Sequence, residues 1–265
     1  MSLAPPEIAA RTTLARTLAA EAGVLALRYF RRQIAYELES KGPQDWVSKA
    51  DRAVEDLVRT RIADTFPDDH FLGEEQGGSV GGNSWVVDPI DGTINFVHGV
   101  RYWCISIGFV ADGVRQIGIV HDPCLGELFW AQRGIGAWCG DARLAVSDCT
   151  ALDRALVVAG YVPRHDLEEY LALRRRMLEA GIAVKDMGAG ALMLAHVAAG
   201  RYDAFYEPHM HPWDAVAGLL LIEEAGGRVH DYPGPAGLAV GGVVIASAPA
   251  LFEPLCRMCA ATTTP

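Results

Sequence analysis

The sequence has few cysteines, few aromatic residues and no apolar run suited to crossing a membrane. Six of its 265 residues are cysteine, and aromatic residues make up 8%. Small secreted folds held by disulfides need a higher density of cysteine, so we expect reduced thiols. The longest stretch without a charged residue, 232–252, contains three prolines and four glycines, which excludes a membrane-spanning helix there. No basic and then apolar leader is visible at the N-terminus, and we expect a cytoplasmic protein.

The only closely spaced cysteines are Cys256 and Cys259, which form a single CxxC pair. One pair without a second is weak evidence for a metal or redox site. We expect two thiols on adjacent turns of a last helix, and a metal or redox role is the alternative.

Positive charge is also scarce. Lysine and arginine number 23 against 33 aspartates and glutamates, which gives a formal net charge of −10. An acidic protein repels nucleic-acid backbones and anionic membranes, so we expect neither as a partner. Phosphate recognition stays open, because gathered carboxylates can bind metal ions that in turn bind phosphate.

The pattern along the chain predicts one folded unit with two unlike halves. An apolar fraction of 51% is enough for a large core, and we expect a single catalytic unit over residues 1–265. Its first half, about 1–150, has helical spacing over 6–33 and 48–65, then strand-like runs over 104–111, 114–121 and 127–131. An Asp112-Gly113 turn joins the first two of these runs.

The second half, about 151–265, alternates between strand-like and helix-like segments. The expected strands are 155–159, 182–185, 204–206 and 243–247, and the expected helices are 167–180, 191–199, 214–225 and 249–260. Such alternation after a meander predicts an α/β (α+β) fold with helices layered on two sheet systems.

Carboxylates gather in three short strings. Glu74 and Glu75 follow a glycine, Asp214 follows Trp213, and the string Asp88-Pro89-Ile90-Asp91-Gly92-Thr93 follows the apolar strand Trp85–Val87. Proline should end that strand, so Asp88 and Asp91 can point into one cleft. Gly77–Gly82 is expected to be a loop.

Closely spaced carboxylates repel one another unless they are protonated or bind a cation. Oxygen ligands without nearby thiols favour a hard cation, Mg²⁺ in particular. Gly92 and Thr93 would place backbone amides at a helix start, where a phosphate binds well. The strings therefore predict a site for a phosphate and a metal ion side by side.

The three strings, together with Glu224-Ala225-Gly226-Gly227, closely resemble the inositol monophosphatase family, and the likeness extends over nearly the whole chain. The resemblance implies a layered αβαβα sandwich and hydrolysis of a small phosphate monoester by metal-activated water. It implies inositol monophosphate as the substrate, two to three Mg²⁺ ions per site, inhibition by lithium and a homodimer. No covalent phosphoenzyme is needed.

Metal ligands are carried over by position. Glu74, Asp88 and the carbonyl group of Ile90 resemble the ligands of a first ion. Asp88, Asp91 and Asp214 resemble those of a second, with Asp88 bridging the two. Glu74 is also the expected catalytic carboxylate that holds a third, weaker ion through water.

The remaining roles follow in the same way. Thr93 with Asp51 resembles the pair that orients the attacking water, and the amides of Gly92 and Thr93 resemble the phosphate cradle. The positions that resemble contacts to substrate hydroxyls are Asp91, Gly188, Ala189, Gly190 and Glu207.

The chain departs from the family pattern around the leaving group. Ile94 stands where a small polar or basic residue is common, and Ala189 replaces a frequent threonine or serine. Asp186 is acidic and could favour a cationic substrate such as histidinol phosphate. Alternatives to inositol monophosphate are therefore histidinol phosphate, a sugar bisphosphate or a nucleotide 3′-phosphate. A regulatory binding protein on the same fold is the alternative of another class.

Three further features have ordinary interpretations. Glu75 is as compatible with a solvated role as with a catalytic one. His209-x-His211 could suggest zinc, but the surrounding oxygen ligands favour a loop. Arg174-Arg175-Arg176 is expected to be a solvated helix face.

Overall fold

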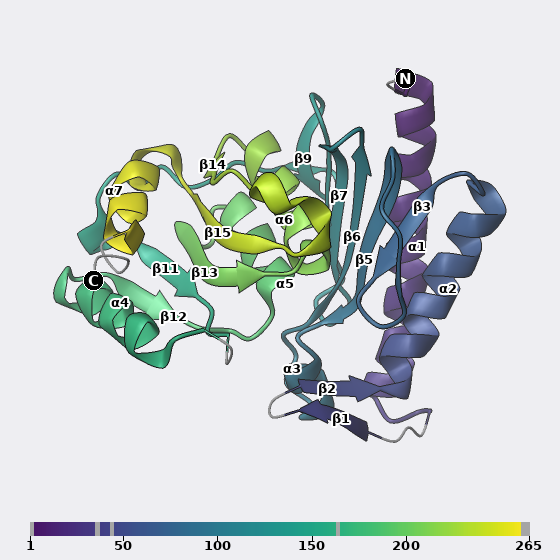
Figure 1. The fold of residues 1–265 in the computed structure, drawn as a ribbon, viewed down its shortest axis with the longest axis horizontal. Helices are drawn as coiled ribbons and strands as arrows, with labels where there is room; N and C mark the ends of the chain where they lie inside the picture. The colour runs from purple at the N-terminus through teal and green to yellow at the C-terminus, as the bar shows by residue number, and fades with distance from the viewer. Residues whose placement is uncertain (1–2, 35–37, 43–44, 163–164, 261–265) are drawn as a thin grey trace.

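The computed structural model describes residues 3–34, 38–42, 45–162 and 165–260, whose helices and strands form five layers (Figure 1). In order, these are a helix pair, an eight-stranded sheet, a second helix pair, a five-stranded sheet and a third helix pair. A small hairpin, β1 (Leu38–Gly42) with β2 (Asp45–Ser48), lies beside the short helix α3 (Thr93–Val97). The predicted αβαβα sandwich is confirmed.

The larger sheet has the strand order β10-β9-β8-β7-β6-β5-β3-β4 and is antiparallel except where β3 pairs with β5. Its strands are β3 (His70–Gly73), β4 (Gly77–Gly78), β5 (Asn83–Asp91), β6 (Cys104–Ala111), β7 (Val114–Asp122), β8 (Glu127–Gln132), β9 (Gly136–Cys139) and β10 (Ala142–Arg143). Asp112 and Gly113 have φ of 48° and 77°, the backbone that a two-residue hairpin turn requires. The predicted turn is therefore confirmed.

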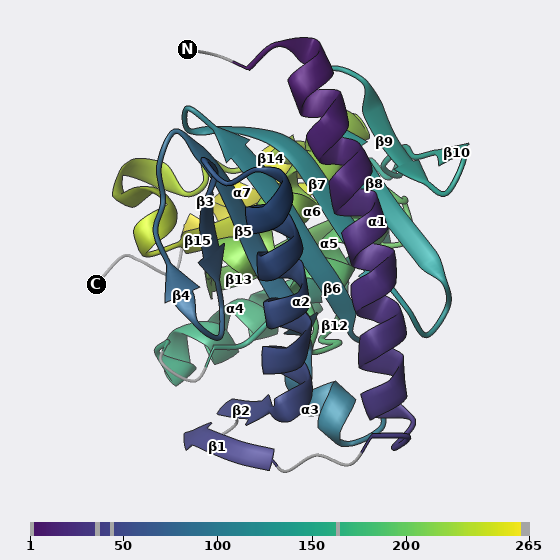
Figure 2. The ribbon, with the colours of Figure 1, turned by 90° about the vertical axis from the view of Figure 1, so that its right-hand side faces the viewer.

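Helices α1 (Pro5–Phe30) and α2 (Lys49–Thr65) cover the outer face of this sheet (Figure 2). Leu18 of α1 and Val54 of α2 are fully buried against Trp85 and Ile107 of the sheet. Small residues on α1 let the helix lie close to the strands; they are Ala15, Ala19, Ala22 and Ala26, all fully buried.

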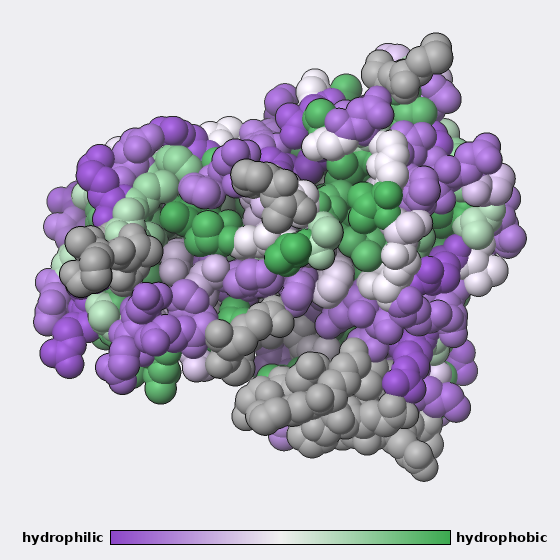
Figure 3. Space-filling view, viewed as in Figure 1, coloured by the Kyte–Doolittle hydropathy of each residue, from purple (hydrophilic) through white to green (hydrophobic). Residues whose placement is uncertain are grey.

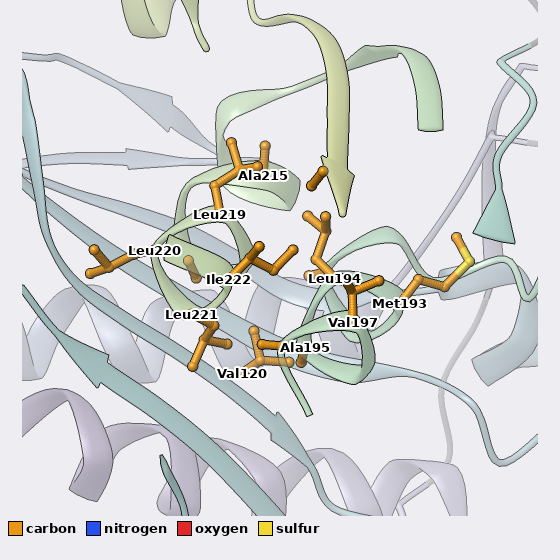
Figure 4. Packing of buried hydrophobic residues seen from close by; sticks show 14 of the residues in the cluster. Val120, Met193, Leu194, Ala195, Val197, Ala215, Leu219, Leu220, Leu221 and Ile222 are labelled. Atoms are coloured by element: carbon orange, nitrogen blue, oxygen red, sulfur yellow. The ribbon is translucent and has the colours of Figure 1, made fainter. Parts of the chain in front are cut away.

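Helices α5 (Gly190–Ala198) and α6 (Pro212–Glu224) form the middle layer. They are apolar on nearly every side, as expected of helices covered on both faces. Figure 4 shows Val120 of β7 beside side chains of both helices. A Cβ atom at Gly118 of β7 would lie 2.4 Å from the carbonyl oxygen of Ala217, so glycine permits the close approach of α6.

The smaller sheet has the order β12-β11-β13-β15-β14 and is covered on its outer face by α4 (Leu167–Glu179) and α7 (Pro249–Ala260). Its strands are β11 (Leu156–Ala159), β12 (Ala183–Lys185), β13 (Ala204–Met210), β14 (Arg228–Val229) and β15 (Gly242–Ser247), and two 3₁₀ segments span Leu152–Arg154 and Gly234–Ala239. Hydrophilic side chains cover α4 and α2 on the face seen in Figure 3. Arg175 of α4 is exposed, as the solvated-face interpretation expects, but Arg174 and Arg176 are half-buried, and Arg176 donates to the carbonyl oxygen of Met258 in α7.

One strand runs further than predicted. Strand β5 continues through Asp88 and Pro89 to Asp91. Proline is tolerated because the pairing with β3 ends at Val87 and the register with β6 shifts between Asp88 and Asp91. No ladder hydrogen bond is therefore required of residue 89.

The predicted loop Gly77–Gly82 also contains a short strand, since β4 pairs with β3. In the part of the chain that the structure describes, no helix combines the length and the apolar character needed to cross a membrane.

Candidate active site

A cavity of about 580 Å³ lies where the end of β5 meets α3, the starts of α5 and α6, and strand β13. Its described lining residues include every predicted site residue except Asp51; they are Glu74, Asp88, Ile90, Asp91, Gly92, Thr93, Ile94, Gly160, Tyr161, Asp186, Gly188, Ala189, Gly190, Met193, Glu207, Met210 and Asp214. The cavity therefore combines residues from both halves of the chain.

Four carboxylates converge in this cavity. Oxygen atoms of Asp88, Asp91 and Asp214 lie within 4.8 Å of one another. Glu74 lines the same cavity, and its charge raises the pKa of the neighbouring Asp88. The backbone amide of Glu74 donates to the carbonyl oxygen of Val87 (3.2 Å), which holds the end of β3 beside β5.

These carboxylates are crowded and buried among groups that carry no opposite charge in the described part of the chain. Burial is the main cause that raises the pKa of Glu74, Asp88 and Asp214 well above their ordinary values, and neighbouring carboxylates raise them further. Burial also raises the pKa of Asp91 to about 6. Among the described residues, no arginine or lysine forms an ion pair with any of the four. Such a group of oxygens fits a divalent metal ion.

Asp91 is held by the start of helix α5. Its Oδ1 accepts a hydrogen bond from the Gly190 amide (3.0 Å), and its Oδ2 accepts one from the Leu192 amide (3.2 Å) and one from Cys104 Sγ (3.4 Å). The N-cap residue Ala189 has no side chain able to cap the helix. Asp91 therefore caps α5 from a distant strand and joins the two halves of the chain.

Sequence reasoning missed this contact. The available signal is a helix that starts at Ala189-Gly190 without a serine, threonine, aspartate or asparagine. That pattern indicates that the cap comes from elsewhere in the chain, but only the tertiary fold identifies Asp91 as the acceptor.

Asp214 is the third residue of α6 and occupies the position of a capping-box acid. Its Oδ2 accepts a hydrogen bond from the amide of His211, the N-cap residue, at 3.3 Å. Local helix-start chemistry therefore fixes the orientation of this carboxylate.

Thr93 stands between the cavity and Asp51. Its Oγ1 lies 3.1 Å from the carbonyl oxygen of Ile90 and 3.5 Å from Asp51 Oδ1. Asp51 is fully buried in α2. Because a hydroxyl has one proton and two lone pairs, Thr93 can donate to one of these oxygens and still accept from a water in the cavity.

The chain turns sharply at Gly92, which has a φ of 89°. A Cβ atom there would lie 2.9 Å from the Cβ of Ala189. Gly92 and Ala189 are therefore matched small residues that let β5 lead into α3 beside the start of α5.

The predicted substrate contacts meet at the other side of the cavity. Gly188, Ala189 and Gly190 line it, and so does Glu207 of β13. A Cβ atom at Gly160 would lie 2.3 Å from Glu207 Oε2, so glycine at 160 makes room for that carboxylate. Sequence reasoning missed four lining residues: Gly160, Tyr161, Met193 and Met210.

The features with ordinary interpretations lie apart from the cavity lining. The amide of Glu75 donates to Glu55 Oε2 (2.8 Å). Asp88, Asp91 and Asp214 are the only group of three or more ligand side chains with metal-binding spacing in the described part of the chain. His209-x-His211 therefore gains no support as a zinc site. Cys256 and Cys259 are free thiols on α7.

Comparisons with known proteins agree with this geometry. The inositol monophosphatase family matches residues 8–262. An inositol-1-monophosphatase of Rhizobium meliloti is 39% identical over 219 residues, which cover 81% of this chain and 82% of the relative. A Nus factor SuhB of Pseudomonas aeruginosa is 36% identical over 252 residues, covering 91% and 93% of the two chains.

The fold comparison points the same way. The solved structure of an IMPase from Thermotoga maritima superposes with a TM-score of 0.85 at 31% identity, covering 95% of this chain and 97% of the other. The chain belongs to the inositol monophosphatase family and is a phosphoric monoester hydrolase.

Proposed function

We propose that this protein hydrolyses inositol monophosphate to inositol and phosphate. The observation that carries the proposal is that four carboxylates converge in one cavity and pair with no described arginine or lysine. Thr93 lines the same cavity. The name of the Rhizobium meliloti relative supports the choice of substrate.

We propose Mg²⁺ as the metal, with two to three ions per site. Glu74, Asp88 and the carbonyl group of Ile90 would hold one ion, and Asp88, Asp91 and Asp214 a second. Glu74 would also hold a third ion through water. An all-oxygen ligand set supports a hard cation over zinc. When bound, the ions would supply positive charge for the phosphoryl oxygens and acidify the attacking water.

The chain's own residues orient the reactants. Thr93 accepts a hydrogen bond from the attacking water and passes its own proton toward Asp51, the buried carboxylate 3.5 Å behind it. The amides of Gly92 and Thr93 donate to the phosphate oxygens at the start of α3. Asp91, the segment Gly188–Gly190 and Glu207 contact hydroxyl groups of the leaving alcohol.

The test is phosphate release from inositol 1-phosphate with Mg²⁺, measured for the wild type, Asp91→Asn and Thr93→Ala. We expect both variants to lose activity by about 10²–10³-fold. Asp141→Asn is a matched control, because Asp141 is exposed in the turn between β9 and β10 and does not line the cavity. Undiminished activity of Asp91→Asn would refute the metal assignment.

Three further proposals rest on family membership. We propose a homodimer, a cytoplasmic location and inhibition by lithium. Light scattering should give about twice the chain mass of 28.5 kDa. The name Nus factor describes the Pseudomonas aeruginosa relative, and the complete carboxylate set here supports hydrolysis over a purely regulatory role.

A further inference from the structure

The leaving-group side of the cavity is acidic and apolar. Besides the proposed metal ligands, Gly92, Thr93, Gly160 and the segment 188–190, the described lining consists of Ile94, Tyr161, Asp186, Met193, Glu207 and Met210. None of the described lining residues is lysine, arginine or histidine. A leaving group in this cavity would therefore lie beside the carboxylates of Asp186 and Glu207.

Asp186 belongs to a segment that is tied to the first half of the chain at two points. The Asn95 side-chain amide donates to the carbonyl oxygens of Met187 and Tyr102, both at 2.8 Å. Three residues further on, the Gly190 amide donates to Asp91. These bonds fix the backbone that carries Asp186 relative to the metal-binding carboxylate Asp91.

The side chain of Asp186 is held as well. Its Oδ1 accepts a hydrogen bond from the Gly188 amide at 3.1 Å, which closes a tight turn at the cavity wall. A carboxylate in such a turn has little rotational freedom. Its negative charge therefore occupies a defined place at the cavity wall.

No described cation neutralises this charge by contact. Asp186 forms no ion pair with another described residue, and the guanidinium of Arg174 donates instead to the hydroxyl of Tyr170 (2.8 Å). Partial burial raises the pKa of Asp186, and the Gly188 amide and the more distant Arg174 lower it by less. The carboxylate is free to act on a charged group of the substrate.

We propose that Asp186 selects the leaving group by charge, favouring an alcohol that carries an amine and rejecting one that carries a second phosphate. A cation beside this carboxylate is attracted and an anion is repelled. This inference rests on the proposed function, because it assigns a substrate class to the same cavity. We expect kcat/KM for the esters of neutral polyols such as inositol to lie between those for the amine-bearing and the phosphate-bearing alcohols.

The experiment uses two matched substrate pairs at neutral pH with Mg²⁺. Glucosamine 6-phosphate and glucose 6-phosphate differ by an ammonium group in place of a hydroxyl. Inositol 1,4-bisphosphate and inositol 1-phosphate differ by one phosphate. We expect the wild-type kcat/KM to favour the amine by about tenfold over its partner and the monophosphate by about tenfold over the bisphosphate.

Asp186→Asn should reduce both ratios by about fivefold, mainly through KM. Asp141→Asn removes the same charge away from the cavity and should leave both ratios at the wild-type values. Ratios that are equal in the wild type and Asp186→Asn would overturn the inference.

A binding measurement separates this inference from the proposed function. Calorimetry with Ca²⁺ in place of Mg²⁺ gives the affinity of the same four esters without relying on turnover. Selective binding that Asp186→Asn abolishes, with no phosphate release under Mg²⁺, would refute the proposed function and keep the charge selection. Phosphate release without charge-dependent binding would refute the charge selection and keep the proposed function.

Discussion

Two groups of carboxylates in this protein are shielded from water. In only one of them do arginines of the described chain form ion pairs with the carboxylates. Glu55 of α2 accepts a hydrogen bond from Arg59 (2.8 Å). Asp69 accepts two bonds from Arg11, both at 2.8 Å, and a third from the Trp85 indole at 2.9 Å. Both side chains are buried and hold structure together.

The second group has no ion pair with a described arginine or lysine; its members are Glu74, Asp88, Asp91 and Asp214. Their pKa values are raised mainly by burial, and they crowd one another instead of meeting arginines. The difference teaches how to separate structural from functional acids. A structural acid is neutralised by its own chain, whereas a metal-binding acid is left to be neutralised by an ion.

The largest effect that would test this contrast is on catalysis. Asp88→Asn removes the carboxylate proposed to bridge two ions, so we expect kcat to fall by about 10³-fold. The free energy of unfolding of the metal-free protein should stay the same or rise, because a crowded charge is removed. Phosphate release and urea unfolding measure the two quantities. A metal-free variant that unfolds much more easily would place Asp88 in the structural group.

A structural acid should show the opposite result. Asp69→Asn leaves Arg11 buried without its bidentate partner, and we expect a loss of about 3 kcal/mol in the free energy of unfolding. At low temperature kcat should remain near the wild-type value. Asp68→Asn is the matched control, since Asp68 is exposed in the same turn and should change stability by less than about 0.5 kcal/mol. Equal effects of the two variants would contradict the assignment.

Metal and pH should act together on the crowded group. The pKa of Asp91 in the folded protein is about 6, above the ordinary value of 3.8, so between these values the folded state binds more protons than the unfolded state. The metal-free protein therefore loses this contribution to stability as pH rises from 3.8 through 6. Mg²⁺ should cancel the loss, and we expect a rise in Tm of about 5 °C at pH 7.5.

At pH 5 the rise in Tm should be clearly smaller, because protons compete with Mg²⁺ for the same oxygens. Differential scanning fluorimetry at constant ionic strength measures both shifts. An equal shift at the two pH values would show that Mg²⁺ binds elsewhere.

The smallest effect concerns Glu75, the acid that directly follows Glu74 in the sequence. It does not line the cavity, and its backbone amide donates a hydrogen bond to Glu55. We therefore expect Glu75→Gln to change kcat/KM by no more than about twofold. A loss comparable to that of Asp88→Asn would add Glu75 to the functional group.

Much of the local structure was predictable because local chemistry decides it. Strand β6 has the predicted bounds, and Asp112-Gly113 forms the expected hairpin turn. Helix α4 ends within one residue of the prediction. By contrast, the predicted end of a strand at Pro89 was wrong, because a register shift removes the need for an amide there.

Cavity residues without charge were harder to predict. Tyr161, Met193 and Met210 line the cavity, but their sequence neighbours show no motif. Apolar side chains carry no signal that separates a cavity wall from a core, whereas clustered acids do. The candidate metal ligands could therefore all be named from the sequence, but the uncharged residues Tyr161, Met193 and Met210 could not be assigned to the cavity.

The spacing of Asp88 and Asp91 after an apolar strand already indicated that these two acids share a cleft, and the family resemblance added Glu74 and Asp214. The sequence alone could not dictate that Asp91 would cap helix α5 through the amides of Gly190 and Leu192. Those contacts join residues about a hundred positions apart. They exist because the layered fold packs the middle helices against both sheets, and no local pattern encodes such a meeting.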